Sequence, residues 1–230
     1  MTINTKHEKN TIGLITIGQT PRLDMTPAIR HYCPSGTTIV EKGGLDGKTE
    51  TDIQKLAPEK KQTTLVSRLE NGEKAIISKE KMLPIIQQQV TALNHMKVDF
   101  ILLACTGKFD SFNSDRPVIY PDYLLNHVVK GLFQQGRIGV VIPLPSQSQD
   151  IKEKWSEAGF FATSRFSSPY VFDEEHFSTA ISELDKLPLK AIILDCMGYT
   201  EEMKQKAQAH TSKPVLLSRN IVFSVMASLF

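Results

Sequence analysis

Two of the three cysteines stand at the same point of one repeated pattern. The runs FILLACTGKF (100–109) and AIILDCMGYT (191–200) each contain an apolar stretch that ends in a cysteine, Cys105 or Cys196, followed by X-Gly. A thiolate acts as a base, and a nearby glycine lets the backbone approach a ligand closely. If both thiols reach one cleft, one can remove a hydrogen from a tetrahedral carbon while the other returns one to the opposite face. The pattern predicts a proton transfer that inverts configuration without a metal or pyridoxal cofactor.

A structural interpretation of these cysteines competes with the catalytic one. A single cysteine at the end of an apolar strand is commonly a small core residue. Its recurrence at the same position of both runs favours a function for Cys105 and Cys196. Cys33, in HYCPSG, has no such counterpart and is interpreted as structural. An odd number of cysteines without C-x-x-C spacing predicts free thiols rather than disulfides or a zinc site.

The elements that position the thiols are predicted from continuous apolar runs. Runs of this kind suit strands covered on both faces, which predicts parallel sheets and an α/β fold. The predicted strands lie at residues 11–18, 37–42, 100–105, 117–120, 137–143, 191–196 and 214–217. Between them, the apolar spacing over residues 84–97 predicts an amphipathic helix with Pro84 in its first turn.

The order of these runs repeats along the chain. IGLITIG from Ile12 corresponds to IGVVIPL from Ile138, DFILLACTG to KAIILDCMG, and RPVIYPDYLLNHVVKGLF to SKPVLLSRNIVFSVMASLF. The sequence therefore predicts two similar α/β lobes, each with a mostly parallel sheet flanked by helices. The first copy is longer by roughly 35 residues, which indicates an insertion. Asn71-Gly72 between two apolar runs predicts a β-hairpin within it, over the site.

Polar residues at the predicted strand ends are candidates for substrate binding, because ligands of open α/β sheets gather there. Arg22 suits a bidentate contact with a substrate carboxylate, although a surface salt bridge explains it equally well. Ser218 is predicted to be the N-cap of the last helix, to which Arg219 adds positive charge. Tyr199 either contacts substrate or packs in the core. Asp195 is given a structural role, because strand alternation points it away from the thiol.

The backbone N–H groups that follow each cysteine are predicted to bind a second substrate oxygen or enolate charge. With the residues above, they complete the predicted substrate-binding set: Thr16, Gly18, Gln19, Thr20, Arg22, Thr106, Gly107, Met197, Gly198, Tyr199, Ser218 and Arg219.

Composition limits the partners. With 27 basic and 25 acidic residues the net charge is +2, which gives no electrostatic footprint for nucleic acid. The polar start MTINTKHEKN and the absence of a long apolar run predict neither a signal peptide nor a membrane span, so a cytoplasmic location is expected. A small carboxylate is the expected partner, and self-association stays open. KGGLDGKT has the wrong spacing for a phosphate loop, and the scattered histidines predict no metal site.

Six blocks in order resemble the AroM family, within the aspartate/glutamate/hydantoin racemase superfamily: TIGQTPRLD, GGLDG, CTGKF, VVIPLP, LDCMGY and VLLSRNIV. The resemblance spans nearly the whole chain. It implies two lobes with the site between them, one cysteine per lobe, and a terminal segment that crosses back to the first lobe. We therefore expect a first lobe at 10–117 plus 213–230 and a second at 118–212. Members of this superfamily include racemases of amino acids and hydantoins, a decarboxylase that uses one cysteine, and a maleate isomerase, so the resemblance implies an activity of one of these kinds.

Three functional hypotheses follow. The leading one is a cofactor-independent racemase or isomerase of a small carboxylate, such as an amino acid or a hydantoin, that uses both thiols. The second is an isomerase or decarboxylase with one catalytic cysteine, which the unequal flanks Thr106-Gly107-Lys108 and Met197-Gly198-Tyr199 permit. The third is a protein that binds a small carboxylate in its cleft without catalysis, since fold does not fix function.

Overall fold

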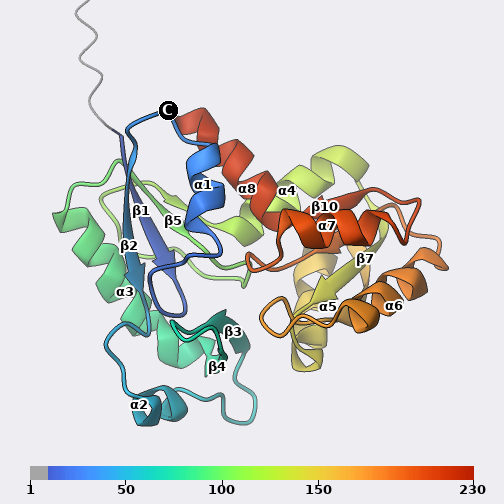
Figure 1. The fold of residues 1–230 in the computed structure, drawn as a ribbon, viewed down its shortest axis with the longest axis horizontal. Coiled ribbons are helices and arrows are strands. Elements are labelled where there is room, and N and C mark those ends of the chain that lie inside the picture. The colour runs from blue at the N-terminus through green and yellow to red at the C-terminus, as the bar shows by residue number, and fades with distance from the viewer. Residues whose placement is uncertain (1–9) are drawn as a thin grey trace, which may run out of the picture.

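Two four-stranded parallel sheets organise the chain, and they share one strand order. The first, with β1, β2 and β5, lies on the left of Figure 1, and the second, with β7 and β10, lies on the right. The computed structural model describes residues 10–230. The first sheet has the order β2-β1-β5-β6, with β1 at Thr11–Thr16, β2 at Thr38–Gly43, β5 at Phe100–Leu103 and β6 at Val118–Ile119. The second has the order β10-β9-β7-β8, with β7 at Gly136–Ile142, β8 at Phe160–Phe166, β9 at Ile192–Leu194 and β10 at Val215–Leu217. Since β7, β8, β9 and β10 occupy the places of β1, β2, β5 and β6, the topology confirms the predicted repeat and the two-lobe α/β fold.

One strand, β8, was not predicted. Within residues 10–230 it pairs with β7 alone, at the edge of the second sheet, and its middle residues are Ala162, Thr163, Ser164 and Arg165. Phe161 is 75% exposed. An edge strand with a half-solvated face lacks the continuous apolar run that marks a central strand such as β5, all four residues of which are buried.

Helices fill the connections, and polar side chains begin several of them. They are α1 (Thr26–His31), α2 (Glu50–Lys55), α3 (Lys79–His95), α5 (Ser148–Glu157), α6 (Glu174–Asp185) and α7 (Glu201–Gln208). The Ser78 hydroxyl accepts a hydrogen bond from the Lys81 N–H, so α3 begins at Lys79 rather than at Pro84. The predicted position of Pro84 in the first turn is wrong, because it lies inside the helix. No helix among residues 10–230 is long and apolar enough to cross a membrane.

The last helix of each repeat covers the sheet of the other repeat. Helix α4 (Pro121–Phe133) follows β6 but packs through Leu125 and Val129 on residues of β7. Helix α8 (Ser218–Met226) follows β10 but packs through Val222, Phe223 and Met226 on the first sheet, beside α1 in Figure 1. The terminal segment therefore crosses back to the first lobe. Because β6 belongs to the first sheet and β10 to the second, the chain crosses between sheets slightly later than the expected lobe boundaries.

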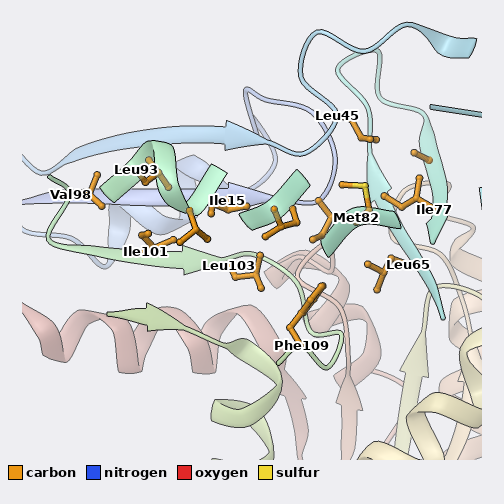
Figure 2. Close-up of a cluster of buried hydrophobic side chains, with 14 residues drawn as sticks. Ile15, Leu45, Leu65, Ile77, Met82, Leu93, Val98, Ile101, Leu103 and Phe109 are labelled. Atoms are coloured by element: carbon orange, nitrogen blue, oxygen red, sulfur yellow. The ribbon is translucent and has the colours of Figure 1, made fainter. Parts of the chain in front are cut away.

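The extra length of the first repeat forms α2 and a β-hairpin. Strand β3 (Thr64–Arg68) pairs antiparallel with β4 (Lys74–Ser78), and Gly72 in the turn has φ +89°, a left-handed conformation that favours glycine. The predicted hairpin is thereby confirmed. Leu65 and Ile77 of the hairpin enter the core that α3 forms with the first sheet (Figure 2).

The hairpin packs closely on the loop after β1, at Gly18. A Cβ atom at Gly18 would lie 2.1 Å from the backbone oxygen of Arg68, and the Gln19 N–H donates to that same oxygen. We expect Gly18→Ala to lower the free energy of unfolding by about 1–3 kcal/mol, since two backbone segments must separate. Gly131→Ala in α4, where a Cβ would meet nothing within 4 Å, is the control and is expected to stabilise by up to about 1 kcal/mol. Urea unfolding measures both, and equal stability of Gly18→Ala and wild type would contradict this packing.

Candidate functional site

The two paired cysteines line one cavity between the lobes. Its volume is about 200 Å³. Cys105 follows β5 in the first lobe and Cys196 follows β9 in the second, so each lobe contributes one thiol. Residues 63–67, including most of β3, form another part of the wall, so the hairpin lies against this cavity. Helix α5 supplies further wall residues, among them Lys154.

Each thiol is held in the same way by the glycine two residues later. The Gly107 N–H donates to Cys105 Sγ at 3.4 Å, and the Gly198 N–H donates to Cys196 Sγ at 3.4 Å. Both glycines are closely covered: a Cβ at Gly198 would lie 2.8 Å from the Tyr170 ring, and one at Gly107 would lie 3.0 Å from the end of the Leu65 side chain in the hairpin. The Cys-X-Gly pattern therefore has a structural reason in both lobes: a backbone donor on sulfur and close packing over the loop.

A buried polar network joins the two cysteine loops. The Thr106 hydroxyl donates to the backbone oxygen of Asp195 at 3.2 Å. Lys154 Nζ donates to the Thr106 backbone oxygen at 3.0 Å and to both Asp195 carboxylate oxygens at 3.0 and 2.9 Å. Trp155 Nε1 also donates to the Asp195 carboxylate. We call Thr106, Lys154, Trp155 and Asp195 the inter-loop network. It ties the residue after Cys105 to the residue before Cys196, and so fixes the spacing of the two loops.

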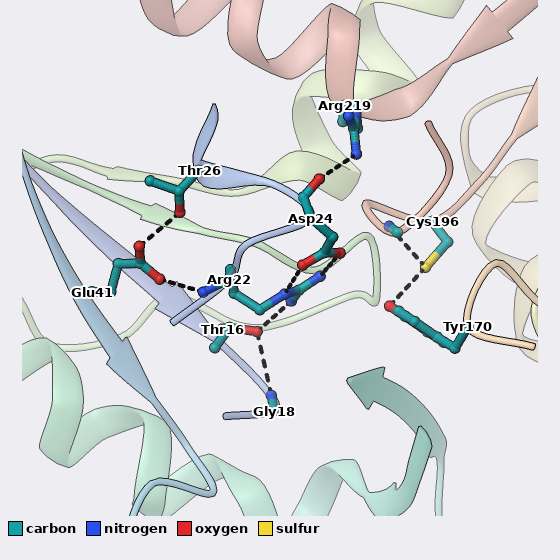
Figure 3. A network of polar contacts seen from close by, with 10 residues as sticks. Thr16, Gly18, Arg22, Asp24, Thr26, Glu41, Tyr170, Cys196 and Arg219 are labelled. Atoms are coloured by element: carbon teal, nitrogen blue, oxygen red, sulfur yellow. Dashed lines mark hydrogen bonds and ion pairs between the residues drawn. The ribbon is translucent and has the colours of Figure 1, made fainter. Parts of the chain in front are cut away.

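The surroundings of the two thiols differ electrostatically. Burial raises the pKa of Cys105 to about 12, and the nearby Cys196 and Asp122 act in the same direction. Burial also raises the pKa of Cys196, but a hydrogen bond from Tyr170 and the positive charge of Arg22 oppose this rise. Tyr170 Oη lies 3.4 Å from Cys196 Sγ (Figure 3). The Gly107 N–H and the charge of Lys154 favour the Cys105 thiolate, so Cys196 differs by having a side-chain hydroxyl donor in addition to a backbone N–H and a nearby cation.

Arg22 is neither at the surface nor free. It is 2% exposed, and its guanidinium donates from Nε and Nη2 to the two Asp24 carboxylate oxygens, each at 2.8 Å, and from Nη1 to the Thr16 hydroxyl at 2.6 Å (Figure 3). The surface salt bridge considered for it is wrong, because the Arg22 side chain is buried and that of Asp24 is only 14% exposed. The guanidinium edge that was expected to hold a substrate carboxylate holds Asp24 instead.

The start of α8 also differs from the prediction. Ser218 is the first residue of the helix, and its hydroxyl donates to the Leu194 backbone oxygen at 2.5 Å, so the predicted N-cap role is wrong. This bond fastens α8 to the end of β9. Arg219 is 6% exposed and donates from Nη1 to the Asp24 backbone oxygen at 3.1 Å. Burial lowers the pKa of Arg219. Both predicted arginines therefore converge on Asp24.

Most other predicted residues hold the loops around the cavity. Cys105, Thr106, Gly107, Cys196 and Met197 line it, whereas Thr16, Gly18, Gln19, Thr20, Arg22, Gly198, Tyr199, Ser218 and Arg219 do not. Thr20 donates its N–H and hydroxyl to Asp46, which closes the GGLDG loop by also accepting from the Gly43 N–H. Tyr199 is fully buried and donates to the Ser167 backbone oxygen, so it packs in the core.

Sequence reasoning missed Tyr170 and Lys154, whereas the structural role expected for Asp195 agrees with its buried ion pair. Tyr170 lies in the loop between β8 and α6, and Lys154 lies in α5 among other charged residues. Neither residue lies in a recognisable motif. Tyr170 is 26 positions from Cys196 in the sequence, and Lys154 is 41 positions from Asp195 and 48 from Thr106, the residues that it contacts. Residues 10–230 bring together no group of three or more His, Cys, Asp or Glu side chains that suits a metal ion.

Comparison with known proteins agrees with this architecture. Residues 12–230 match the family described as AroM protein. The fold is similar to that of the maleate isomerase Iso from Pseudomonas putida S16, with a TM-score of 0.64 and 14% sequence identity over 96% of this chain and 93% of that one. It is similar as well to allantoin racemase from Klebsiella pneumoniae, with a TM-score of 0.60 and 16% identity over 96% of this chain and 87% of that one. A third similar structure is unliganded arylmalonate decarboxylase, with a TM-score of 0.61 and 13% identity over 96% of this chain and 92% of that one. These structures are members of the aspartate/glutamate/hydantoin racemase superfamily. No curated protein sequence matches the chain significantly.

Proposed function

The chain belongs to the AroM family, and from that premise we propose that it is a cofactor-independent racemase or isomerase of a small carboxylate that uses Cys105 and Cys196 as its two proton-transfer groups. The observation that carries the proposal is the equivalent placement of the two thiols. They come from the same position of two repeats, line one cavity, and each accept one N–H from the following glycine. A buried structural cysteine would need neither the shared cavity nor this pairing.

The reaction proceeds by two proton transfers. The Cys196 thiolate takes the hydrogen from the α-carbon as a proton, so the C–H bond breaks, an S–H bond forms, and the electron pair moves into the substrate carbonyl as an enolate. The Cys105 thiol then donates its proton to the opposite face, which forms the new C–H bond and leaves a thiolate on Cys105. Configuration inverts, and atoms and charge balance without a further reactant.

The backbone beside each thiol supplies the enolate contacts in this proposal. Among residues 10–230, the N–H groups of Thr106 and Met197 have no hydrogen-bond acceptor, and both residues line the cavity. Donors of this kind stabilise negative charge that develops on a carboxylate. The Arg22 guanidinium is paired with Asp24, so in this proposal it does not contact the substrate; its positive charge instead favours the Cys196 thiolate. A cavity of about 200 Å³ favours a substrate no larger than an amino acid or a hydantoin.

Hydrogen exchange with solvent tests the proposal. We expect the wild-type protein to incorporate deuterium at the α-carbon of at least one compound when incubated in D2O with amino acids, hydantoins including allantoin, and small dicarboxylates. The measurement is loss of the α-proton NMR signal together with chiral analysis. A Cys105→Ser, Cys196→Ser double variant is the control. A compound that binds to wild type and to this variant equally, without exchange in either, would instead support a non-catalytic binding protein.

A second candidate function rests on the asymmetry of the thiols. Only Cys196 has a hydroxyl partner, Tyr170, among the described residues. An isomerase or decarboxylase in which Cys196 alone acts is consistent with that difference. Product analysis with maleate and an arylmalonate separates this reaction from racemisation.

A further inference from the structure

The hydrogen bonds made by the two sulfurs are matched except at one contact. Each sulfur accepts a backbone N–H at 3.4 Å, but Cys196 Sγ also lies 3.4 Å from the Tyr170 hydroxyl. The ring of Tyr170 lies directly over the Cys196 loop, since its atoms leave no room for a Cβ at Gly198. Tyr170 also lines the cavity. The side chain that contacts the sulfur therefore also borders the space proposed for the substrate.

The loop that carries Tyr170 is held in position by its own hydrogen bonds. The Ser168 hydroxyl accepts from the Tyr170 N–H at 3.2 Å and from the Val171 N–H at 3.4 Å. On the far side, the backbone oxygen of Ser167 accepts the Tyr199 hydroxyl at 2.6 Å. The contact with Cys196 thus comes from a constrained loop.

The charges that act on Cys196 come from both lobes. From the first lobe, the Arg22 guanidinium favours its thiolate, and the Cys105 thiol couples to it. From the second lobe, the Asp195 carboxylate opposes ionisation, although it is paired with Lys154, and the Tyr199 hydroxyl is bonded elsewhere. Tyr170 is the one of these groups that reaches Cys196 Sγ with a side-chain hydrogen bond.

We propose that Tyr170 is a catalytic residue that donates its hydroxyl hydrogen bond to the Cys196 thiolate and so makes Cys196 the base and Cys105 the acid of the resting protein. The proposal deepens the proposed function and rests on it. Cys105, which has no such partner among residues 10–230, keeps its proton until the enolate forms. When Cys196 has taken the substrate proton, the Tyr170 hydroxyl remains as a neutral partner of the thiol.

The test measures ionisation directly and needs no substrate. The ultraviolet absorbance of the thiolate is titrated with pH in wild type and in Cys196→Ser, and the difference gives the pKa of Cys196. We expect Tyr170→Phe to raise this pKa by about one unit, which lowers the thiolate fraction about tenfold at any pH below it. Tyr199→Phe is the matched control: it also removes a buried hydroxyl in the second lobe, and we expect it to leave the pKa unchanged.

An unchanged pKa in Tyr170→Phe, or an equal shift in Tyr199→Phe, would overturn the proposal. If Tyr170→Phe fails to fold, the comparison of Cys105→Ser with Cys196→Ser still decides: Cys196 must ionise at lower pH than Cys105, and the reverse order would overturn the assignment. Neither measurement depends on turnover. The Tyr170 proposal can therefore be contradicted by the titration even if solvent exchange is observed, and it can be supported by the titration even if no exchange is found.

Discussion

Replacing either paired cysteine by serine, Cys105→Ser or Cys196→Ser, is expected to lower the rate of racemisation by roughly 10³-fold. A serine hydroxyl ionises far less readily than a thiol, so it can neither remove nor return the substrate hydrogen at a useful rate. Each thiol serves one face of the carbon in the proposed reaction. Each single variant should therefore lose inversion, and the Cys105→Ser variant, which retains the base, should keep some exchange of the α-hydrogen with D2O.

Cys33→Ser is the matched control for these substitutions. The Cys33 thiol donates to the backbone oxygen of Ile29 in α1, at 3.2 Å, and Cys33 does not line the cavity. We expect the racemisation rate of the Cys33→Ser variant to remain within a few-fold of the wild-type rate. The measurement is chiral chromatography of the product over time. Loss of activity in Cys196→Ser alone would contradict the two-thiol reaction and favour the single-cysteine alternative.

Breaking the buried ion pair of the inter-loop network is expected to have the largest effect on stability. Lys154 and Asp195 are 5% and 2% exposed, and Lys154→Met leaves the Asp195 carboxylate buried without its cation. An uncompensated buried charge costs about 3–5 kcal/mol. We expect a loss of that size in urea unfolding, together with loss of activity, because the same lysine joins the Cys105 and Cys196 loops.

An exposed pair provides the control. Arg165 and Glu183 form an ion pair with side chains that are 37% and 47% exposed, and Arg165→Met is expected to cost no more than about 1 kcal/mol. A Lys154→Met, Asp195→Leu double variant should regain much of the lost stability, because no buried charge remains. If Lys154→Met costs no more than Arg165→Met, the inter-loop network does not hold the loops as described.

The exchange of helices between the repeats explains why the site has fixed geometry. α4 leaves the first sheet to cover the second, and α8 leaves the second sheet to cover the first. Each lobe thus completes its core with a helix from the other repeat. Ser218 fastens α8 to Leu194, two residues before Cys196, while Arg219 on the same turn reaches Asp24 of the first lobe. The second thiol is therefore anchored to both lobes.

Local chemistry in the sequence is sufficient for the central strands, the hairpin and the paired thiols. Continuous apolar runs predict β1, β5, β7 and β9, because strands buried on both faces exclude polar residues. Asn71-Gly72 predicts the hairpin through its turn conformation. The repeat places Cys105 and Cys196 at equivalent strand ends, where ligands of parallel α/β sheets gather.

Tertiary structure alone decided which polar groups meet at those ends. Arg22 matches a carboxylate site by residue type, yet the carboxylate it holds is Asp24, two residues away. Tyr170 and Lys154 carry no local signal, because they reach the thiol loops only when sheets and helices from distant parts of the chain pack together. Residue type and spacing state which hydrogen bonds and ion pairs a side chain can make. The partner that it finds is chosen by burial, since each buried donor or charge must be satisfied by whatever group the packing places beside it.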